Sequence, residues 1–127
     1  MLFRDAEILL AVHSSFWGKR HKRWGLPGGN IEWREDPIDT VRRELREELQ
    51  VNIREFTEIG VYQYKGNNHI VFGAHTDHAI EDYDTRELLD IGWYSMPSVE
   101  SLKQERKLHA GYELHAAQTY LSLLKPG

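Results

Sequence analysis

The order of strand and helix patterns along the sequence fits an α/β fold, in which helices cover both faces of a mixed β-sheet. Three observations support this prediction: an amphipathic helix pattern over residues 37–49, strand-like runs on both sides of it, and a second helical pattern near the C-terminus. With 127 residues, of which 40% are hydrophobic, the chain has the size and composition of one packed domain spanning residues 1–127.

Charge and composition exclude several classes of function. The formal net charge is -4, whereas broad nucleic-acid binding needs a basic surface, so we expect no stable nucleic-acid partner. No apolar run approaches the roughly 20 residues that a membrane-spanning helix needs. The chain has no cysteine, which excludes disulfides and thiolate metal sites, and its start has no signal-peptide pattern, so we expect a cytoplasmic protein.

The first clear strand pattern covers residues 7–13, an aliphatic run bounded by polar residues. A loop over residues 14–23 follows, in which Trp17 is a candidate for stacking on a base, with a hydrophobic plug as the alternative. Residues 19–23 form a local basic patch directly before Trp24. Arg23 in this patch is a candidate for binding a phosphorylated ligand, and a solvated hairpin loop is the alternative.

The helix predicted over residues 37–49 has clear start signals, because Asp36 is a good N-cap and Pro37 suits the first helical position. The apolar stripe that should pack on the sheet consists of Ile38, Val41, Leu45 and Leu49. Beside this stripe Glu44, Glu47 and Glu48 are spaced i, i+3 and i+4, so their carboxylates share one face and repel one another. A solvated acidic face paired with neighbouring arginines explains this pattern about as well as a functional site does.

The turn in front of the helix favours a functional site. Pro27, Gly28 and Gly29 bring a backbone with free carbonyl groups and no bulky side chains close to the acidic face. Hard cations bind carboxylate and carbonyl oxygens together, and a magnesium ion would relieve the repulsion between the glutamates.

The residues from Gly29 onward carry a family resemblance. The sequence has Gly29, five residues, Glu35, seven residues, Arg43-Glu44-Leu45, one residue, Glu47-Glu48, one residue, and then Gln50-Val51. This pattern resembles the Nudix box of the MutT-like small Nudix hydrolases, and the flanking Trp24-Gly25-Leu26-Pro27 and Trp93 resemble the same proteins. Every charged position of the box matches. Two positions depart from it: Gln50 stands where the family's glycine ends the helix, and Arg34 stands where many members have glycine.

The resemblance implies a Nudix-type α/β/α sandwich around a mixed β-sheet, and it assigns roles to the box residues. The metal ligands would be the carboxylates of Glu44, Glu47 and Glu48 and the carbonyl of Gly29, binding Mg²⁺ or alternatively Mn²⁺. Glu35 and Arg43 would pair and brace the loop against the helix. At Gln50 the family's glycine takes a left-handed conformation, which costs a residue with a Cβ about 1 kcal/mol.

The resemblance also implies a longer strand before residues 7–13, and Met1–Arg4 leaves little room for it. We therefore expect that first strand to be shortened, displaced, or supplied by a partner chain, and the last of these would make the protein a homodimer.

After the box, a strand-like region runs to Tyr64 with a break near Gly60, residues 65–68 form a turn, and residues 69–75 return as its partner. Tyr62 and Tyr64 alternate onto one face, where they line a nucleotide pocket or simply cover the sheet. The later elements are a polar loop over residues 77–87, a strand over 88–94, a short helical piece around 99–102 and a longer amphipathic helix over 104–124.

The polar loop supplies a further candidate acid. In the family, an acid from the loop before the last strand often approaches the metal. Glu87 has the best placement for this role, with Glu81 as the second choice. His75 and His78 have a spacing that is only a weak metal signal, and a solvated loop explains them better.

The predicted function is that of a magnesium-dependent pyrophosphohydrolase, which cleaves the diphosphate of a nucleoside diphosphate linked to another group. A glutamate would take the proton of the attacking water, and the candidates for this base are Glu44, Glu47 and Glu87. The alternative is a nucleotide-sensing binding module on the same fold without catalysis, which we would expect to have lost some of the glutamates. ADP-ribose, nucleoside triphosphates, dinucleoside polyphosphates and nucleotide sugars all stay open as the small nucleotide substrate.

Overall fold

The structure is a computed structural model, and it describes residues 1–14, 22–27 and 35–124. Its elements, in chain order, are β1 (Leu2–Arg4), β2 (Glu7–His13), α1 (Pro37–Leu49), β3 (Thr57–Tyr64), β4 (Asn67–His75), β5 (Leu88–Ser95), α2 (Met96–Gln104) and α3 (Glu113–Leu123). No helix within these described ranges is long and apolar enough to cross a membrane.

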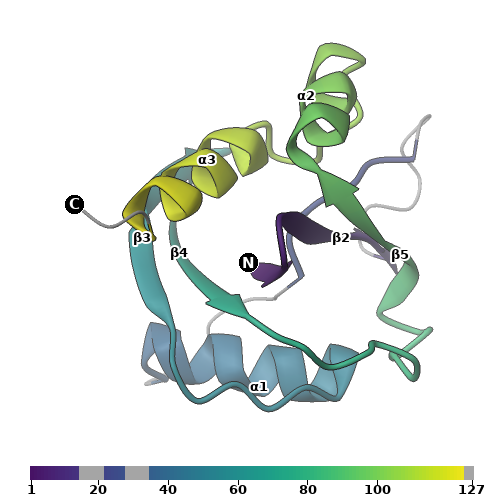
Figure 1. Cartoon of the computed structure of the whole chain (residues 1–127), viewed down its shortest axis with the longest axis vertical. Coiled ribbons are helices and arrows are strands. Elements are labelled where there is room, and N and C mark those ends of the chain that lie inside the picture. Colours follow the sequence, from purple (N-terminus) through teal and green to yellow (C-terminus); the bar gives the residue numbers. More distant parts are fainter. Residues whose placement is uncertain (15–21, 28–34, 125–127) are drawn as a thin grey trace.

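The strands form one sheet in the order β3-β4-β1-β2-β5. The pair β1–β4 is parallel, and the pairs β1–β2, β2–β5 and β3–β4 are antiparallel. Helix α1 lies on one side of the sheet, and α2 and α3 lie on the other (Figure 1). The predicted α/β/α sandwich around a mixed sheet is therefore confirmed.

The hydrophobic core has two parts, one on each face of the sheet. Because side chains alternate along a strand, neighbouring residues of β2 contribute to opposite faces: Ile8 and Leu10 to the α3 side, and Leu9 and Ala11 to the α1 side. All four are fully buried. This packing fixes α1 against one face of the sheet, and so it fixes where the acidic side of α1 can point.

Strand β1 has three residues, Leu2–Arg4, and lies between β4 and β2 in the sheet. Phe3 pairs with Ile8 of β2 and with His75 of β4, and it is fully buried. The terminal amine of Met1 donates to the carbonyl of Phe72 at 2.8 Å, and burial lowers the pKa of this amine to about 5.

Helix α1 has the predicted bounds, Pro37–Leu49, and the predicted left-handed end. Gln50 has φ 57° and ψ 37°, and the next residue, Val51, donates its backbone N–H to the Leu45 carbonyl at 3.3 Å. The N-cap differs in one detail, because the Asp36 side chain makes no capping bond. Instead the Asp36 carbonyl accepts the backbone N–H of Thr40 at 3.0 Å.

The β3–β4 hairpin is tighter than predicted. Residues 51–56 form no regular structure, so the strand-like region begins at Thr57. The turn has two central residues, Lys65 and Gly66, and both have positive φ, 49° and 80°. This conformation matches the twist of the flanking strands in a two-residue hairpin. The predicted break near Gly60 is a register shift between Glu58 and Gly60.

The prediction of one helix over residues 104–124 was wrong in its first half. Helix α2 continues to Gln104, and α3 begins only at Glu113. Between them Arg106 and Gly111 have positive φ, 59° and 94°, which interrupts a right-handed helix. The buried Glu113 carboxyl group accepts the backbone N–H groups of residues 110 and 111 at 2.9 and 2.7 Å, so one side chain holds this connection in place.

Candidate active site

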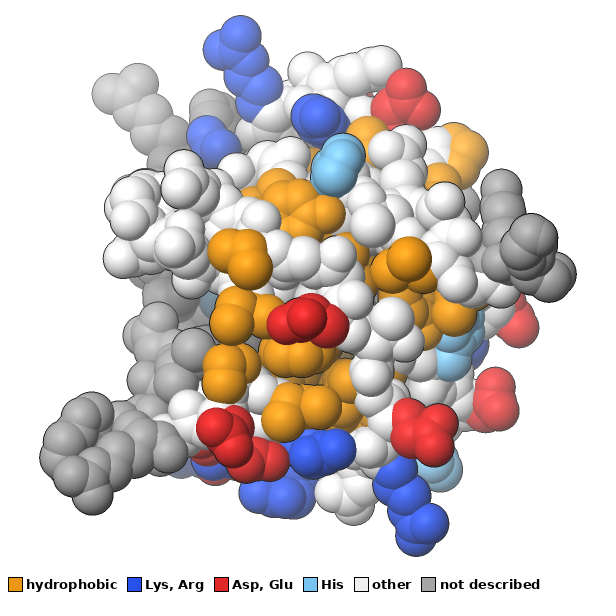
Figure 2. Space-filling model, turned by 90° about the vertical axis from the view of Figure 1, so that its left-hand side faces the viewer, with side chains coloured by type: hydrophobic (Ala, Val, Ile, Leu, Met, Phe, Trp, Pro, Cys, Tyr) orange, Lys and Arg blue, Asp and Glu red, His pale blue; other side chains and the backbone are white. Residues whose placement is uncertain are grey.

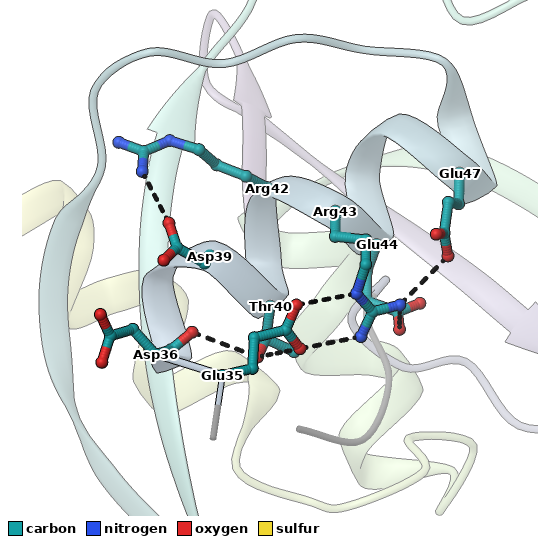
Figure 3. Close-up of polar contacts among 8 residues, drawn as sticks. All are labelled: Glu35, Asp36, Asp39, Thr40, Arg42, Arg43, Glu44 and Glu47. Carbon is teal, nitrogen blue, oxygen red and sulfur yellow. Dashed lines mark hydrogen bonds and ion pairs between the residues drawn. The ribbon is translucent and has the colours of Figure 1, made fainter. Parts of the chain in front are cut away.

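Arg43 lies at the centre of the acidic side of α1 (Figure 3). Its Nε and Nη2 atoms donate to the two carboxylate oxygens of Glu35 at 2.9 and 3.0 Å, so the two side chains form a two-bond fork. Its Nη1 atom donates to Glu44 Oε1 at 2.9 Å and to Glu47 Oε2 at 3.2 Å. Thr40 Oγ1 donates a further hydrogen bond of 2.8 Å to Glu35. One arginine therefore holds three carboxylates, one from before the helix and two from successive turns of it.

The surroundings of Glu44 raise the pKa of its carboxyl group. Burial raises the pKa of Glu44. The charge of Arg43 and its hydrogen bond lower this pKa, and the negative charge of Glu47 raises it further. The side chains of Glu44 and Glu48 are also hydrogen-bonded to each other.

His13, the last residue of β2, reaches the site from the sheet and is only 7% exposed. Its Nε2 atom lies 3.0 Å from the carbonyl oxygen of Leu26 and must donate to it, since a carbonyl only accepts. Its Nδ1 atom lies 4.0 Å from Oε2 of the buried Glu48. Burial lowers the pKa of His13, whereas the Leu26 carbonyl and the charge of Glu87 raise it.

Sequence reasoning missed His13, because it counted only as the last residue of an aliphatic strand. The available signal was weak: a polar, titratable side chain at the end of the run Ile8–Val12, just before the loop. Nothing local in the sequence indicates that this strand end faces the last turn of α1.

Glu87 approaches the same corner of the molecule through the chain around it. Its carbonyl accepts the backbone N–H of Ser14 at 2.8 Å, and its charge acts on His13. The loop before it is also attached to α1, because the backbone N–H of Asp84 donates to the Glu48 carbonyl at 2.8 Å. The Glu87 side chain itself is exposed. The structure therefore places this predicted acid beside His13, at the edge of the acidic cluster.

The donor atoms of the cluster suit a hard divalent cation, because Glu44, Glu47 and Glu48 all offer carboxylate oxygens. Arg43 occupies one oxygen of Glu44 and one of Glu47 and leaves the other oxygen of each carboxylate. Within the part of the chain that the structure describes, no three side chains of this kind are close enough to hold an ion. The predicted carbonyl ligand, Gly29, lies outside the described residues.

Of the predicted substrate-binding residues, the two tyrosines do not lie beside these glutamates. Trp17 lies outside the described residues. The Nε atom of Arg23 is buried and has no hydrogen-bond partner among them. Tyr62 and Tyr64 pack on the α3 side of the sheet: the Tyr62 ring stacks on Tyr112 with centroids 4.9 Å apart, and the Tyr64 ring lies 5.0 Å from that of His109. The tyrosines therefore face away from α1.

A cleft of about 840 Å³ lies beside the opposite side of α1. Arg42 lines it, and Figure 3 shows this side chain pointing away from the Arg43 cluster. None of Glu44, Glu47 and Glu48 lines the cleft. Figure 2 views the molecule from the left-hand side of Figure 1, where hydrophobic side chains gather in the middle of the face and charged side chains lie around them. This cleft therefore does not coincide with the acidic cluster.

Comparisons with known proteins support one family. The model of the NUDIX domain matches residues 1–115, while no curated protein sequence matches the chain. A MutT NUDIX hydrolase from Burkholderia pseudomallei is 26% identical, with a TM-score of 0.64 over 76% of this chain and 79% of that chain. The NUDIX domain of Shewanella oneidensis NrtR, complexed with ADP ribose, is 19% identical, with a TM-score of 0.74 over 98% and 84%.

A C. elegans Ap4A hydrolase is 14% identical and has a TM-score of 0.69 over 97% of this chain and 93% of that chain. These structures share the sandwich fold described above, and the family model covers nearly all of the chain, including the whole of the Arg43 cluster. The chain therefore belongs to the NUDIX domain family, as a hydrolase that acts on phosphorus-containing anhydrides.

Proposed function

We propose that this protein is a magnesium-dependent pyrophosphohydrolase that cleaves the diphosphate of a nucleoside diphosphate linked to another group. One observation carries the proposal: a single guanidinium, that of Arg43, holds together Glu44 and Glu47 of α1 and Glu35, which precedes the helix. Uncompensated acids at this spacing would repel one another. An array that keeps them together is suited to a cation and to the anionic substrate that the cation accompanies.

The metal ligands in this proposal are Glu44, Glu47 and Glu48 together with the carbonyl of Gly29, and Mn²⁺ is the alternative to Mg²⁺. When bound, the ion would neutralise charge on the diphosphate and lower the pKa of an attacking water. Arg43 would keep the carboxylates oriented, because each of its bonds to Glu44 and Glu47 restricts one oxygen and leaves the other for the ion.

The chemical step is the attack of a water oxygen on one phosphorus, with cleavage of the bond from that phosphorus to the bridging oxygen. A carboxylate takes the proton of the water, and the departing phosphate carries away the bonding electron pair. Glu44 is our first choice, because burial raises its pKa and so makes its carboxylate a better proton acceptor. Glu87 is the second choice, since it lies beside His13 on an exposed loop, and Glu47 is the third.

The substrate in this proposal is a small nucleotide, and ADP-ribose is the first compound to try because the similar NrtR domain was crystallised with it. The buried Nε of Arg23 would be satisfied by a phosphate oxygen of the substrate. Trp17 stays a candidate for contact with the base, whereas Tyr62 and Tyr64, which pack on the α3 side of the sheet, would contact only a part of the substrate that extends away from α1. We further propose that residues 1–127 form one domain that acts in the cytoplasm. A measurement of the molar mass in solution would show whether the protein is a homodimer.

The experiment is a screen with Mg²⁺ of ADP-ribose, nucleoside triphosphates, dinucleoside polyphosphates and nucleotide sugars, measuring phosphate release after coupling to a phosphatase. We expect turnover that EDTA abolishes and Mg²⁺ or Mn²⁺ restores, and we expect Glu48→Gln to remove most of it. Asp39→Asn is the matched control, because it removes one acid from the same helix on the side that pairs with Arg42 at 3.3 Å. Undiminished turnover in EDTA would contradict the mechanism, whereas tight nucleotide binding without any turnover would indicate the binding module.

A further inference from the structure

The two edge strands of the sheet, β3 and β5, differ in how their outward backbone groups are used. Ala11 exchanges two backbone bonds with Gly25 on the side away from β5, so Ile91, which pairs with Ala11, directs its N–H group outward. The Asp90 carboxylate accepts this N–H at 2.9 Å and also pairs with Lys22. Charged side chains on an edge prevent pairing with a further strand. The β5 edge is therefore blocked at its middle.

The β3 edge is open. Ala74 of β4 donates its N–H to Met1 on the β1 side, and because bonds alternate along a strand, the odd-numbered residues of β4 bond toward β3. His69 is one of these residues, so its partner Tyr62 bonds to β4, and the neighbouring Val61 directs its N–H and C=O groups outward. No hydrogen bond from another described residue reaches these two groups.

The outer side of β3 also exposes hydrophobic side chains. Val61 is 58% exposed, the largest exposed fraction among the large hydrophobic residues that the structure describes. Helix α3 contacts β3, and its last residue, Leu123, is 55% exposed. Strand β3 forms the left-hand edge of the sheet in Figure 1, so Figure 2 looks onto it: hydrophobic side chains gather in the middle, with charged ones around them. This pattern is typical of a protein–protein contact.

The charges on β3 favour a second copy of the same strand as the partner. Glu58 lies near the beginning of β3, Lys65 directly follows its end, and both are exposed. When two copies of β3 pair antiparallel about Val61, residues equally far from Val61 face each other, so Thr57 lies opposite Lys65 of the second copy. Glu58 of each strand then lies beside Lys65 of the other, and the symmetry repeats this contact between opposite charges at both ends.

We propose that two copies of this chain associate through β3, as an antiparallel pair about a two-fold axis at Val61 that joins the two sheets into one. Such a contact uses the same surface on both chains and closes as a dimer. Backbone bonds supply affinity when a strand is added to an open edge. A few residues of one edge bury less area than a standard interface, so the dimer is reversible and its population rises with protein concentration. The inference goes beyond the proposed function and does not depend on it.

Analytical ultracentrifugation of the full-length chain over a series of concentrations measures this association. The average mass of the wild type should rise from that of one chain, 14.9 kDa, toward twice that value. Val61→Lys places two positive charges against each other at the axis and should keep the mass of one chain. Leu89→Lys is the matched control, because Leu89 is a 43% exposed hydrophobic residue on the blocked β5 edge. This control should associate as strongly as the wild type.

Reversal of the charges tests the register of the pair. Glu58→Lys alone and Lys65→Glu alone each bring like charges together at both ends of the contact. Cross-strand charge pairs of this kind should raise the dissociation constant of the dimer by about 2–30-fold. The double variant Glu58→Lys/Lys65→Glu exchanges the two charges and should restore the association of the wild type. Such a rescue separates a direct contact from a change in the fold.

A crosslink gives an independent measurement if Val61→Lys fails to fold. The chain has no cysteine, so Val61→Cys introduces its only thiol. A short bismaleimide should link two Val61→Cys chains and leave Leu89→Cys chains unlinked. The inference is wrong if the wild type keeps the mass of one chain at every soluble concentration, if folded Val61→Lys associates as strongly as the wild type, or if only Leu89→Cys is linked. The screen for phosphate release tests the proposed function separately, so the two failures are distinguishable.

Discussion

Replacing Gln50 by glycine should stabilise the protein, because Gln50 ends α1 in the left-handed region with φ 57° and ψ 37°. A residue with a Cβ pays about 1–2 kcal/mol in this conformation. Glycine relieves that strain, but its greater conformational freedom in the unfolded chain lowers the unfolding free energy by about 0.4–1 kcal/mol. The backbone bonds of the helix end should be retained, since they do not involve the side chain. The difference between these two ranges is about 0–1.6 kcal/mol, so we expect a net gain in unfolding free energy near its midpoint, about 0.8 kcal/mol.

Urea denaturation followed by circular dichroism measures this gain, and thermal unfolding should show a rise of roughly 2–5 °C for a domain of this size. The matched control is Glu105→Gly. Glu105 ends α2 and is also exposed, but its φ is -82°, so glycine has no left-handed strain to relieve there. We expect that control to lose stability. A loss of stability in Gln50→Gly, or an equal gain in Glu105→Gly, would refute the strain argument.

Three further predictions concern charged groups. Glu44→Gln should lower turnover and also weaken Mg²⁺ binding. If Glu87 is the general base, Glu87→Gln should lower turnover by up to about 10²–10⁴-fold without weakening Mg²⁺ binding. Full turnover of Glu87→Gln at saturating Mg²⁺ would exclude Glu87 as the base. In Arg43→Lys the lysine cannot make the two-bond fork with Glu35, and the side chains of Arg43 and Glu35 are only 17% and 16% exposed. The unfolding free energy measured by urea denaturation should therefore fall by about 1–3 kcal/mol. An unchanged midpoint would argue against a bracing role for this pair. Burial raises the pKa of Glu113 above its ordinary value of 4.5, so its stabilising contribution is fully present below pH 4.5 and is lost as pH rises through the raised pKa. The advantage of the wild type over Glu113→Gln in unfolding free energy should therefore shrink as pH rises above 4.5, and a difference that is constant with pH would contradict this reasoning.

The sequence was sufficient where local rules decide the structure. Helix α1 begins and ends where Asp36, Pro37 and Gln50 predict, because start signals, apolar spacing and the family's turn position all agree there. Strand β2 has the predicted bounds for a similar reason, as a continuous aliphatic run leaves few alternatives. The pairing of Glu35 with Arg43 follows the resemblance closely, since both residues belong to one short motif.

Long-range contacts could not be predicted in the same way. The helical periodicity of residues 104–124 continues across Leu108, yet the structure pairs Leu108 with Trp24 in a β-bridge. A helix and a β-bridge would both bury Leu108, so its apolar side chain does not distinguish between these two backbone conformations. The contact of His13 with Glu48 has the same origin, because it depends on how the end of β2 meets α1 across the sheet. In both cases the deciding partner is distant in the chain.

The three-residue strand β1 has a consequence for how the protein reaches its native state. In the described sheet, β1 joins the β3–β4 hairpin to the β2–β5 pair. The hairpin closes across a two-residue turn, whereas β1 pairs Leu2 with Ala74, so a long stretch of chain must first be brought together. Pairings of such high sequence separation are slow to form. The two local hairpins, β3–β4 and β1–β2, should therefore form first. The pairings of β1 with β4 and of β2 with β5, which join Leu2 to Ala74 and Glu7 to Ser95, should complete the sheet as late steps of folding.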